Sequence, residues 1–161
     1  IRRNYDFYEP RTVHESSLSP CVHAIIAAKL GDEARAYEFY LRTSRLDLDD
    51  YNNDTEDGCH ITSMAGTWMS VVEGFGGMRV RDGKLSFDPF LPEKWQSFSF
   101  KVGFRGTSLK VTVRKEQVSI DHLSGPDIKF LLRGRERELT ANQGVTVVSV
   151  SLQVPLPNSL K

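Results

Sequence analysis

The sequence has little cysteine and no excess of either charge. Its 161 residues contain two cysteines, Cys21 and Cys59, which are too few for a disulfide framework. With no apolar segment of a secretory signal at its start, the chain is expected in the reducing cytoplasm. Lysine and arginine together number 21, as do aspartate and glutamate. Nucleic-acid-binding domains usually carry a basic excess, so this balance argues against a nucleic-acid partner.

Long apolar runs and several catalytic motifs are also absent. No apolar segment approaches the roughly 20 residues that cross a bilayer, so no membrane partner is expected. The sequence has no nucleophile elbow and no glycine-rich phosphate loop, because Gly74, Gly76 and Gly77 follow a helical pattern instead of opening one. The chain begins without methionine, in sequence that looks structured. We therefore expect a fragment of a larger protein.

The first half of the chain carries helical signals. Ser19 can cap a helix that has Pro20 at its first position, and Gly31 supplies a stop. Asp32 is placed to cap a second helix that continues to about Ser44. The short gap between the two helices predicts an antiparallel hairpin.

The third predicted helix has the strongest periodicity. Apolar residues fall at i, i+3, i+4, i+7, i+10, i+11 and i+14, the spacing of one helix face, at Ile61, Met64, Ala65, Trp68, Val71, Val72 and Phe75. The glycines at 74, 76 and 77 end this helix. Three helices cannot close a domain by themselves, so they either belong to a small α+β protein or complete a larger helical barrel.

After Gly77 the spacing becomes that of β-strands. Arg81-Asp82-Gly83 is a hairpin signal between two short apolar segments. Strands are expected at 78–80, 84–87, 98–104, 109–113, 118–121, 128–132, 136–140 and 145–152, in a sandwich or jelly-roll sheet. The sequence thus predicts an α+β fold, with helices in residues 1–77, a β-sheet domain in residues 78–154 and a frayed tail in residues 155–161.

Two segments place histidine and hydroxyl side chains next to a predicted helix start. The candidate residues are His14, Ser16 and Ser17 in the first segment, and His60 and Ser63 in the second. The first N–H groups of a helix are unpaired and carry partial positive charge, so such segments can bind an oxyanion or phosphate. The alternative is two ordinary capped helices, with an exposed histidine and with Gly66 packed against a neighbouring helix.

No metal site is expected. The acidic stretch at residues 47–58 fails the EF-hand spacing and is better explained as a hydrogen-bonded loop. Zinc ligation by Cys21, His23, Cys59 and His60 would need a non-standard spacing. Four glutamates could serve as an acid in glycoside chemistry, and the sequence distinguishes none of them: Glu9, Glu15, Glu56 and Glu73.

Three stretches together resemble glycoside hydrolase family 65. They are YDFYEPRTVHESSLSPCVHAIIAAKLGD, YLRTSRLDLDDYNNDTEDGCHITSMAGTW and VVEGFGGMRVRDGKLSFDPFLPEKW, and they cover most of residues 4–95. The resemblance implies that the helices are the C-terminal ones of an (α/α)6 catalytic barrel, followed by an antiparallel β-sandwich or jelly-roll domain.

The resemblance is strongest to the branch that contains maltose phosphorylases. It implies an inverting disaccharide phosphorylase, which uses inorganic phosphate as co-substrate, needs no cofactor, and releases β-glucose 1-phosphate and glucose. The general-acid glutamate would lie upstream, in the rest of the parent chain, so this fragment would hold no catalytic residue and would be inactive alone. Phosphorylases of this type are often homodimers.

The resemblance also assigns the five candidate residues to the phosphate pocket. In hydrolases of the family, a carboxylate base takes roughly the place of His14, an apolar residue replaces His60, and glycine replaces Ser63. A phosphorylase must accept a dianion, which a carboxylate would repel and an imidazole attracts. A family hydrolase stays open as an alternative, since Glu15 adjoins His14. So does a non-catalytic β domain that binds sugar through Trp95, Phe90 and Phe104.

Overall fold

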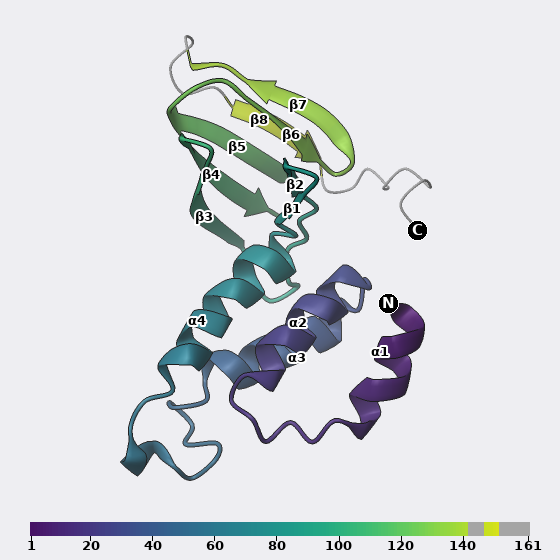
Figure 1. The fold of residues 1–161 in the computed structure, drawn as a ribbon, viewed down its shortest axis with the longest axis vertical. Helices are drawn as coiled ribbons and strands as arrows, with labels where there is room; N and C mark the ends of the chain where they lie inside the picture. Colours follow the sequence, from purple (N-terminus) through teal and green to yellow (C-terminus); the bar gives the residue numbers. More distant parts are fainter. Residues whose placement is uncertain (142–146, 152–161) are drawn as a thin grey trace. The chain divides into compact units, whose positions relative to one another are not determined.

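The computed structural model describes residues 1–141 and 147–151, and the chain divides into two compact units, Ile1–Phe75 and Gly76–Lys161. The first unit is built of helices and the second of strands (Figure 1). This confirms the predicted α+β class.

The helical unit has more elements than the sequence indicated. In chain order they are α1 (Arg2–Tyr8), the 3-10 helix η1 (Glu9–Arg11), α2 (Ser19–Lys29), α3 (Glu33–Ser44), the 3-10 helix η2 (Thr55–Asp57), α4 (Ile61–Met69) and the π-helix η3 (Ser70–Phe75). Asp32 caps α3 as predicted, because its carboxylate accepts a hydrogen bond from the Arg35 backbone N–H at 3.1 Å. The predicted capping role of Ser19 is wrong, since Leu18 is the N-cap of α2 and the Ser19 hydroxyl bonds to His14.

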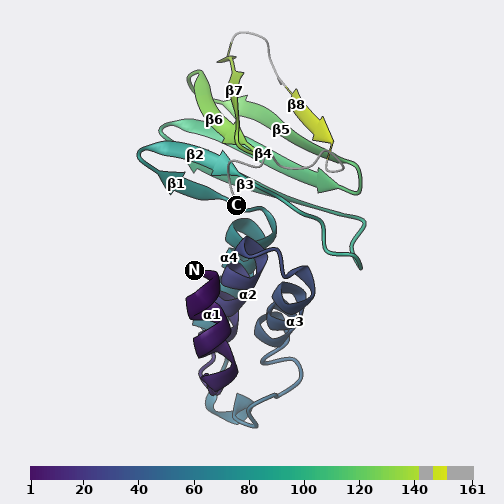
Figure 2. The same ribbon diagram turned by 90° about the vertical axis from the view of Figure 1, so that its right-hand side faces the viewer.

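Helix α2 is central to the helical unit, where it contacts α3, α4 and η3 (Figure 2). Ala24 and Ala27 of α2, and Ala36 and Phe39 of α3, are buried. Alanine has a small side chain, so α2 and α3 approach closely at these positions and enclose the ring of Phe39.

Helix α4 buries a different face from the one that its apolar spacing suggests. Ser63, Gly66 and Ser70 are buried, whereas the side chains of Ile61 and Trp68 are 68% and 53% exposed. A Cβ atom at Gly66 would lie 2.8 Å from both Cβ and Sγ of Cys21 in α2. Gly66 therefore makes the close contact with α2, Ser63 faces α3, and the apolar stripe reaches the core in η3.

The two long helices that follow the histidine segments run parallel to each other. Gly66 lies against Cys21, and eight residues later Gly74 lies near Ile25 and Ala28. Contacts that advance together along both helices require the same direction, so the N-terminal ends of α2 and α4 lie at one end of the helical unit (Figure 1). At 1.5 Å per residue, the two helix starts are offset along the axis by only about 4.5 Å.

The β unit contains two four-stranded sheets. The strands are β1 (Arg79–Arg81), β2 (Lys84–Phe87), β3 (Ser97–Phe104), β4 (Thr107–Arg114), β5 (Gln117–Ser124), β6 (Ile128–Leu132), β7 (Arg135–Leu139) and β8 (Val147–Ser151). One sheet has the order β1-β2-β6-β7 and the other β3-β4-β5-β8. All pairs are antiparallel except β2 with β6. The ends of the predicted 145–152 strand and the 155–161 tail lie outside the described residues.

The two sheets pack face to face as a β-sandwich, as predicted. The ring of Phe87 in one sheet lies 6.3 Å, centroid to centroid, from that of Phe100 in the other. Phe87, Phe130, Leu109 and Ile120 are buried between the sheets. The predicted hairpin at residues 81–83 is confirmed: Asp82 and Gly83 both have positive φ, at 50° and 69°, as a tight hairpin turn requires.

Candidate functional site

The His14 ring is packed inside the helical unit. Its Nδ1 lies 2.8 Å from the hydroxyl of Ser19, and its centroid lies 4.5 Å from that of His23 in an edge-to-face contact and 4.9 Å from that of Phe39. The His14 side chain is only 9% exposed. This residue therefore anchors the loop before α2 to the hairpin of α2 and α3.

A half-buried ion pair lies beside His14. Arg35 donates to Glu9 through Nε at 3.2 Å and through Nη2 at 2.5 Å, and the same Glu9 oxygen lies 3.8 Å from His14 Nε2. Burial is the main cause that lowers the pKa of His14, the charges of His23 and Arg42 add to it, and Glu9 opposes it. The imidazole of His14 is thus held mainly in its neutral form at pH 7.

The two serines that follow His14 lie on the loop ahead of α2. Ser16 is exposed, and its hydroxyl accepts a hydrogen bond of 3.3 Å from the Leu18 backbone N–H. Ser17 is half-buried. Of the first candidate segment, these two hydroxyls are the groups that an anion could reach from solvent.

His60 is bound by a carboxylate on each side of its ring. Asp47 places one oxygen 2.6 Å from Nδ1 and accepts the His60 backbone N–H with the other at 2.9 Å. Asp54 lies 3.4 Å from Nε2. The hydrogen bond to Asp47 is the main cause that raises the pKa of His60, and the charge of Asp54 acts in the same direction. His60 therefore carries positive charge more readily than His14, and a cationic donor suits an anion.

The hydroxyl of Ser63 faces the protein interior. Ser63 is 1% exposed, and its Oγ donates to the backbone carbonyl of Thr43 in α3 at 3.2 Å. The neighbouring residue Arg42 donates from Nη2 to the backbone carbonyl of His14. Consecutive residues near the C-terminal end of α3 thus hold both candidate segments.

The geometry brings the two segments to one end of the helical unit but does not pair their histidines. Parallel α2 and α4 begin there, and Arg42 and Thr43 connect the segments through α3. Within residues 1–141 and 147–151, no hydrogen bond or ring contact joins His14 to His60. Ser16 and Ser17 lie on the loop ahead of α2, and the His60 side chain is 22% exposed with a carboxylate at each ring nitrogen. His14 and Ser63 are held by internal hydrogen bonds. The assignment of these five residues to phosphate stays a prediction.

Several partners of the candidate residues carry no sequence signal. Asp47 is 13 residues from His60, and Arg42 is 28 residues from His14. Neither spacing belongs to one helix face or to one turn. The hairpin of α2 and α3 brings Arg42 to His14, and the packing of α3 beside α4 brings Asp47 to His60. The sequence identifies Asp47 only as one member of the acidic stretch at residues 47–58.

The acidic stretch is a hydrogen-bonded loop. One oxygen of Asp50 accepts from the backbone N–H groups of Asp54 and Thr55, at 3.1 Å each, and from the Thr55 hydroxyl at 2.8 Å. No group of three or more histidine, cysteine or acidic side chains in the described part of the chain could hold a metal ion. Cys21 is buried and Cys59 is exposed.

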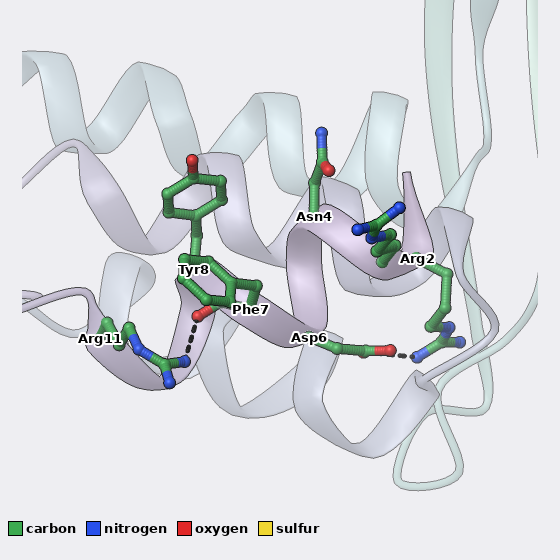
Figure 3. Close-up of a pocket in the computed structure, with 7 residues that line it drawn as sticks. Arg2, Asn4, Asp6, Phe7, Tyr8 and Arg11 are labelled. Carbon is green, nitrogen blue, oxygen red and sulfur yellow. Dashed lines mark hydrogen bonds and ion pairs between the residues drawn. The ribbon is translucent and has the colours of Figure 1, made fainter.

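An open cavity borders α1. It is lined by Arg2, Arg3, Asn4, Asp6, Phe7, Tyr8 and Arg11. In Figure 3 the guanidinium of Arg11 turns back to the Phe7 carbonyl, and that of Arg2 pairs with Asp6. None of the predicted phosphate residues lines this cavity. Among the described residues, no helix is long and apolar enough to span a membrane.

The pKa values of His14 and His60 should lie on opposite sides of the ordinary histidine value of about 6.5. The pKa of His14 is lowered in the folded protein, so His14 takes up a proton on unfolding at a pH between the folded and the ordinary pKa. Its contribution to stability is therefore present above the ordinary pKa and is lost as the pH falls through the lowered folded pKa. For His60 the sign reverses, because its contribution is present at low pH and is lost as the pH rises through the raised pKa. A titration of the histidine Hε1 NMR signals should place His60 above His14, and the reverse order would contradict the two environments.

The chain matches two domain families that share one name. Residues 1–69 match the glycosyl hydrolase family 65 central catalytic domain, and residues 78–139 match the family 65 C-terminal domain. Each match falls within one of the two units of the structure.

Curated proteins and a solved structure agree with these matches. The chain is 50% identical over 149 residues to the maltose phosphorylase of Bacillus subtilis (strain 168), covering 88% of this chain and 20% of that protein. It is 47% identical over 130 residues to the α,α-trehalose phosphorylase of Thermoanaerobacter brockii, covering 81% and 17%. A solved structure assigned as a kojibiose phosphorylase from the human microbiome aligns with a TM-score of 0.85 and 39% identity, covering 94% of this chain and 22% of that one.

The chain spans about a fifth of the length of the curated relatives that it matches. Those relatives act on different disaccharides, so the comparisons do not choose a substrate. The domain matches, the sequence identities and the shared fold give one result: this chain belongs to glycoside hydrolase family 65.

Proposed function

We propose that this chain supplies the phosphate side of the active site of an inverting disaccharide phosphorylase of the maltose phosphorylase type. The carrying observation is the parallel arrangement of α2 and α4, whose N-terminal ends lie together, each beside a segment with histidine and serine. Helix N-termini favour anions through unpaired N–H groups and the helix dipole. Phosphate is the anion that a phosphorylase must position.

The five predicted residues divide into two roles in this proposal. Ser16, Ser17 and His60 contact the phosphate in this proposal, because the two serines lie on the loop ahead of α2 and the His60 ring carries positive charge more readily than the His14 ring. His14 and Ser63 hold the loop and the helix start in place through Ser19 and Thr43. Phosphate then attacks the anomeric carbon, while a glutamic acid outside this chain protonates the departing sugar oxygen. The products are β-glucose 1-phosphate and glucose.

The exposed apolar face of α4 supports a larger helical domain around this unit. Ile61, Met64 and Trp68 are 68%, 49% and 53% exposed, which is unusual for neighbouring large apolar side chains on one helix. In the proposal the preceding part of an (α/α)6 barrel covers them. Inorganic phosphate is the co-substrate, no further cofactor takes part, and the parent is a cytoplasmic homodimer.

The 161-residue chain alone should not turn over disaccharide. Positioned binding groups cannot replace a general acid that lies elsewhere in the barrel. Maltose, trehalose and kojibiose are each incubated with the chain and phosphate, and glucose 1-phosphate is measured. Product formation at a rate that scales with chain concentration would contradict the proposed division of the active site.

Phosphorolysis itself is tested in a full-length enzyme that contains this chain. Glucose release should require phosphate, and the sugar phosphate formed first should be the β-anomer. The second candidate is an α-glucoside hydrolase of the same family, favoured by the carboxylate of Glu9 at 3.8 Å from His14 Nε2. Turnover at an equal rate without phosphate would select that hydrolase. The paired Arg35 argues against Glu9 as a free base.

A non-catalytic sugar-binding β domain gains no support from the aromatic residues considered for it. Trp95 contacts Phe98 edge-on at 5.8 Å, and Arg105 covers the ring of Phe104 at 5.3 Å. Trp95, Phe90 and Phe104 are all half-buried. Their rings serve packing within the β unit and do not form an open stacking platform.

A further inference from the structure

The imidazole of His60 faces two carboxylates that hold it very differently. Asp47 makes two hydrogen bonds, at 2.6 Å to Nδ1 and at 2.9 Å to the backbone N–H. Asp54 makes one longer contact, at 3.4 Å to Nε2. The Asp47 side chain is 16% exposed and that of Asp54 is 37% exposed. Asp47 is thus a fixed partner, and Asp54 is the more easily displaced one.

The backbone of Asp54 is held independently of its side chain. Asp50 accepts hydrogen bonds from the backbone N–H groups of Asp54 and Thr55 and from the Thr55 hydroxyl. The carboxylate of Asp54 can therefore leave His60 by rotating about its side-chain bonds, with the loop unchanged. No rearrangement of the contact between Asp47 and His60 is needed.

We propose that the Asp54 carboxylate is an internal competitor that occupies Nε2 of His60 until inorganic phosphate displaces it, while Asp47 positions the ring for the exchange. The inference rests on the proposed phosphorylase function. A phosphate oxygen and a carboxylate oxygen need the same donor, and two anions cannot share one N–H without repulsion. Asp54 thereby lowers the affinity for phosphate.

The charges around His60 agree with this exchange. The carboxylates that raise its pKa are those of Asp47 and Asp54, and the bond to Asp47 acts most strongly. Because Asp47 remains bound when Asp54 leaves, the ring keeps a partner that favours its charged form. Asp47 is therefore a positioning residue, and Asp54 tunes affinity.

Three asparagine substitutions in a full-length enzyme that contains this chain separate these roles. Asp54→Asn should lower the KM for inorganic phosphate by about threefold to tenfold, the effect of losing one competing hydrogen bond to a charged group. Asp47→Asn should raise that KM and should shift the alkaline limb of the pH profile of kcat/KM for phosphate to lower pH. Asp47→Glu keeps the carboxylate, so its KM and its alkaline limb should lie between those of Asp47→Asn and the wild type. Asp57→Asn, at an exposed position in the same loop, removes one negative charge and should change neither.

The outcomes distinguish this inference from the proposed function. If the wild-type enzyme requires phosphate but Asp54→Asn leaves its KM unchanged or raises it, the competitor role is refuted and phosphorolysis stands. An equal fall in KM for Asp57→Asn would also refute it, because the effect would then be one of net charge. Turnover of the wild type without phosphate would refute both. The His60 Hε1 signal, followed by NMR during a phosphate titration, should respond at lower phosphate concentration in Asp54→Asn than in the wild type.

Discussion

Replacement of His60 by alanine in a full-length enzyme is expected to lower kcat/KM for inorganic phosphate by about tenfold to a hundredfold. The substitution removes a charge-assisted donor, and mutations of that kind typically have effects of this size. It also leaves Asp47 and Asp54 without the imidazole that separates them, so two carboxylates would face the incoming dianion. Phosphorolysis rates at varied phosphate and fixed saturating disaccharide measure the change.

Two controls separate phosphate binding from damage to the fold. The KM for the disaccharide should change little, because His60 is assigned to the phosphate side. His60→Gln keeps a side-chain donor without the positive charge and should fall between the wild type and the alanine variant. A loss of kcat/KM that is equal for phosphate and disaccharide would contradict the assignment.

Replacement of Gly66 by alanine is expected to destabilise the helical unit by about 1–2 kcal/mol. The added Cβ would lie 2.8 Å from Cβ and Sγ of Cys21, closer than non-bonded carbon atoms approach. Overpacking of this kind costs about 1–3 kcal/mol, and the better helix propensity of alanine offsets about 1 kcal/mol at most. Denaturant unfolding of the 161-residue chain, followed by circular dichroism at a helical wavelength, measures the difference.

The same substitution at Gly74 is the matched control. Its Cβ would lie 3.8 Å from the Cα of Ile25, an ordinary van der Waals distance. Gly74→Ala should therefore be neutral or slightly stabilising. The predicted contrast fails if both variants unfold at the same denaturant concentration. In a full-length enzyme, Gly66→Ala should also raise the KM for phosphate, because the Gly66 contact with Cys21 sets the spacing of the two helix starts.

Local sequence signals located most of the elements. The cap at Asp32, the turn at Asp82-Gly83 and the alternation in residues 98–104 and 109–113 each depend on neighbouring residues only, and the structure agrees with all three. The short N-terminal helix α1 was not predicted, because no side chain caps its first turn and no residue in it is buried. Nothing local distinguishes such a segment from a loop.

The buried face of α4 could not be read from its periodicity. An apolar stripe indicates which side of a helix avoids water in the complete protein. Within this chain, Gly66 faces α2 because the absence of a side chain allows close approach, and Ile61 and Trp68 remain exposed. In the proposed function the stripe packs against other helices of the barrel, whereas Gly66 makes the close contact with α2 within this chain.

The residue types of the candidate site could be predicted from the sequence, but the residues that His14 and His60 contact could not. Histidine and hydroxyl groups beside helix starts follow from short stretches of sequence. The burial of His14 against Phe39 depends on how α3 packs beside α2, and the pairing of His60 with Asp47 depends on how α4 packs beside α3. These tertiary contacts raise the pKa of His60 and bury His14, and neither outcome can be read from the two segments alone.

The central claim is that phosphate binds where α2 and α4 begin together. A crystal structure of a full-length enzyme that contains this chain, grown with inorganic phosphate, tests this most directly. We expect a phosphate within hydrogen-bond distance of His60 Nε2 and of the Ser16 and Ser17 hydroxyls, with Asp54 turned away. A phosphate bound elsewhere in the active site, with Asp54 still on His60, would contradict it.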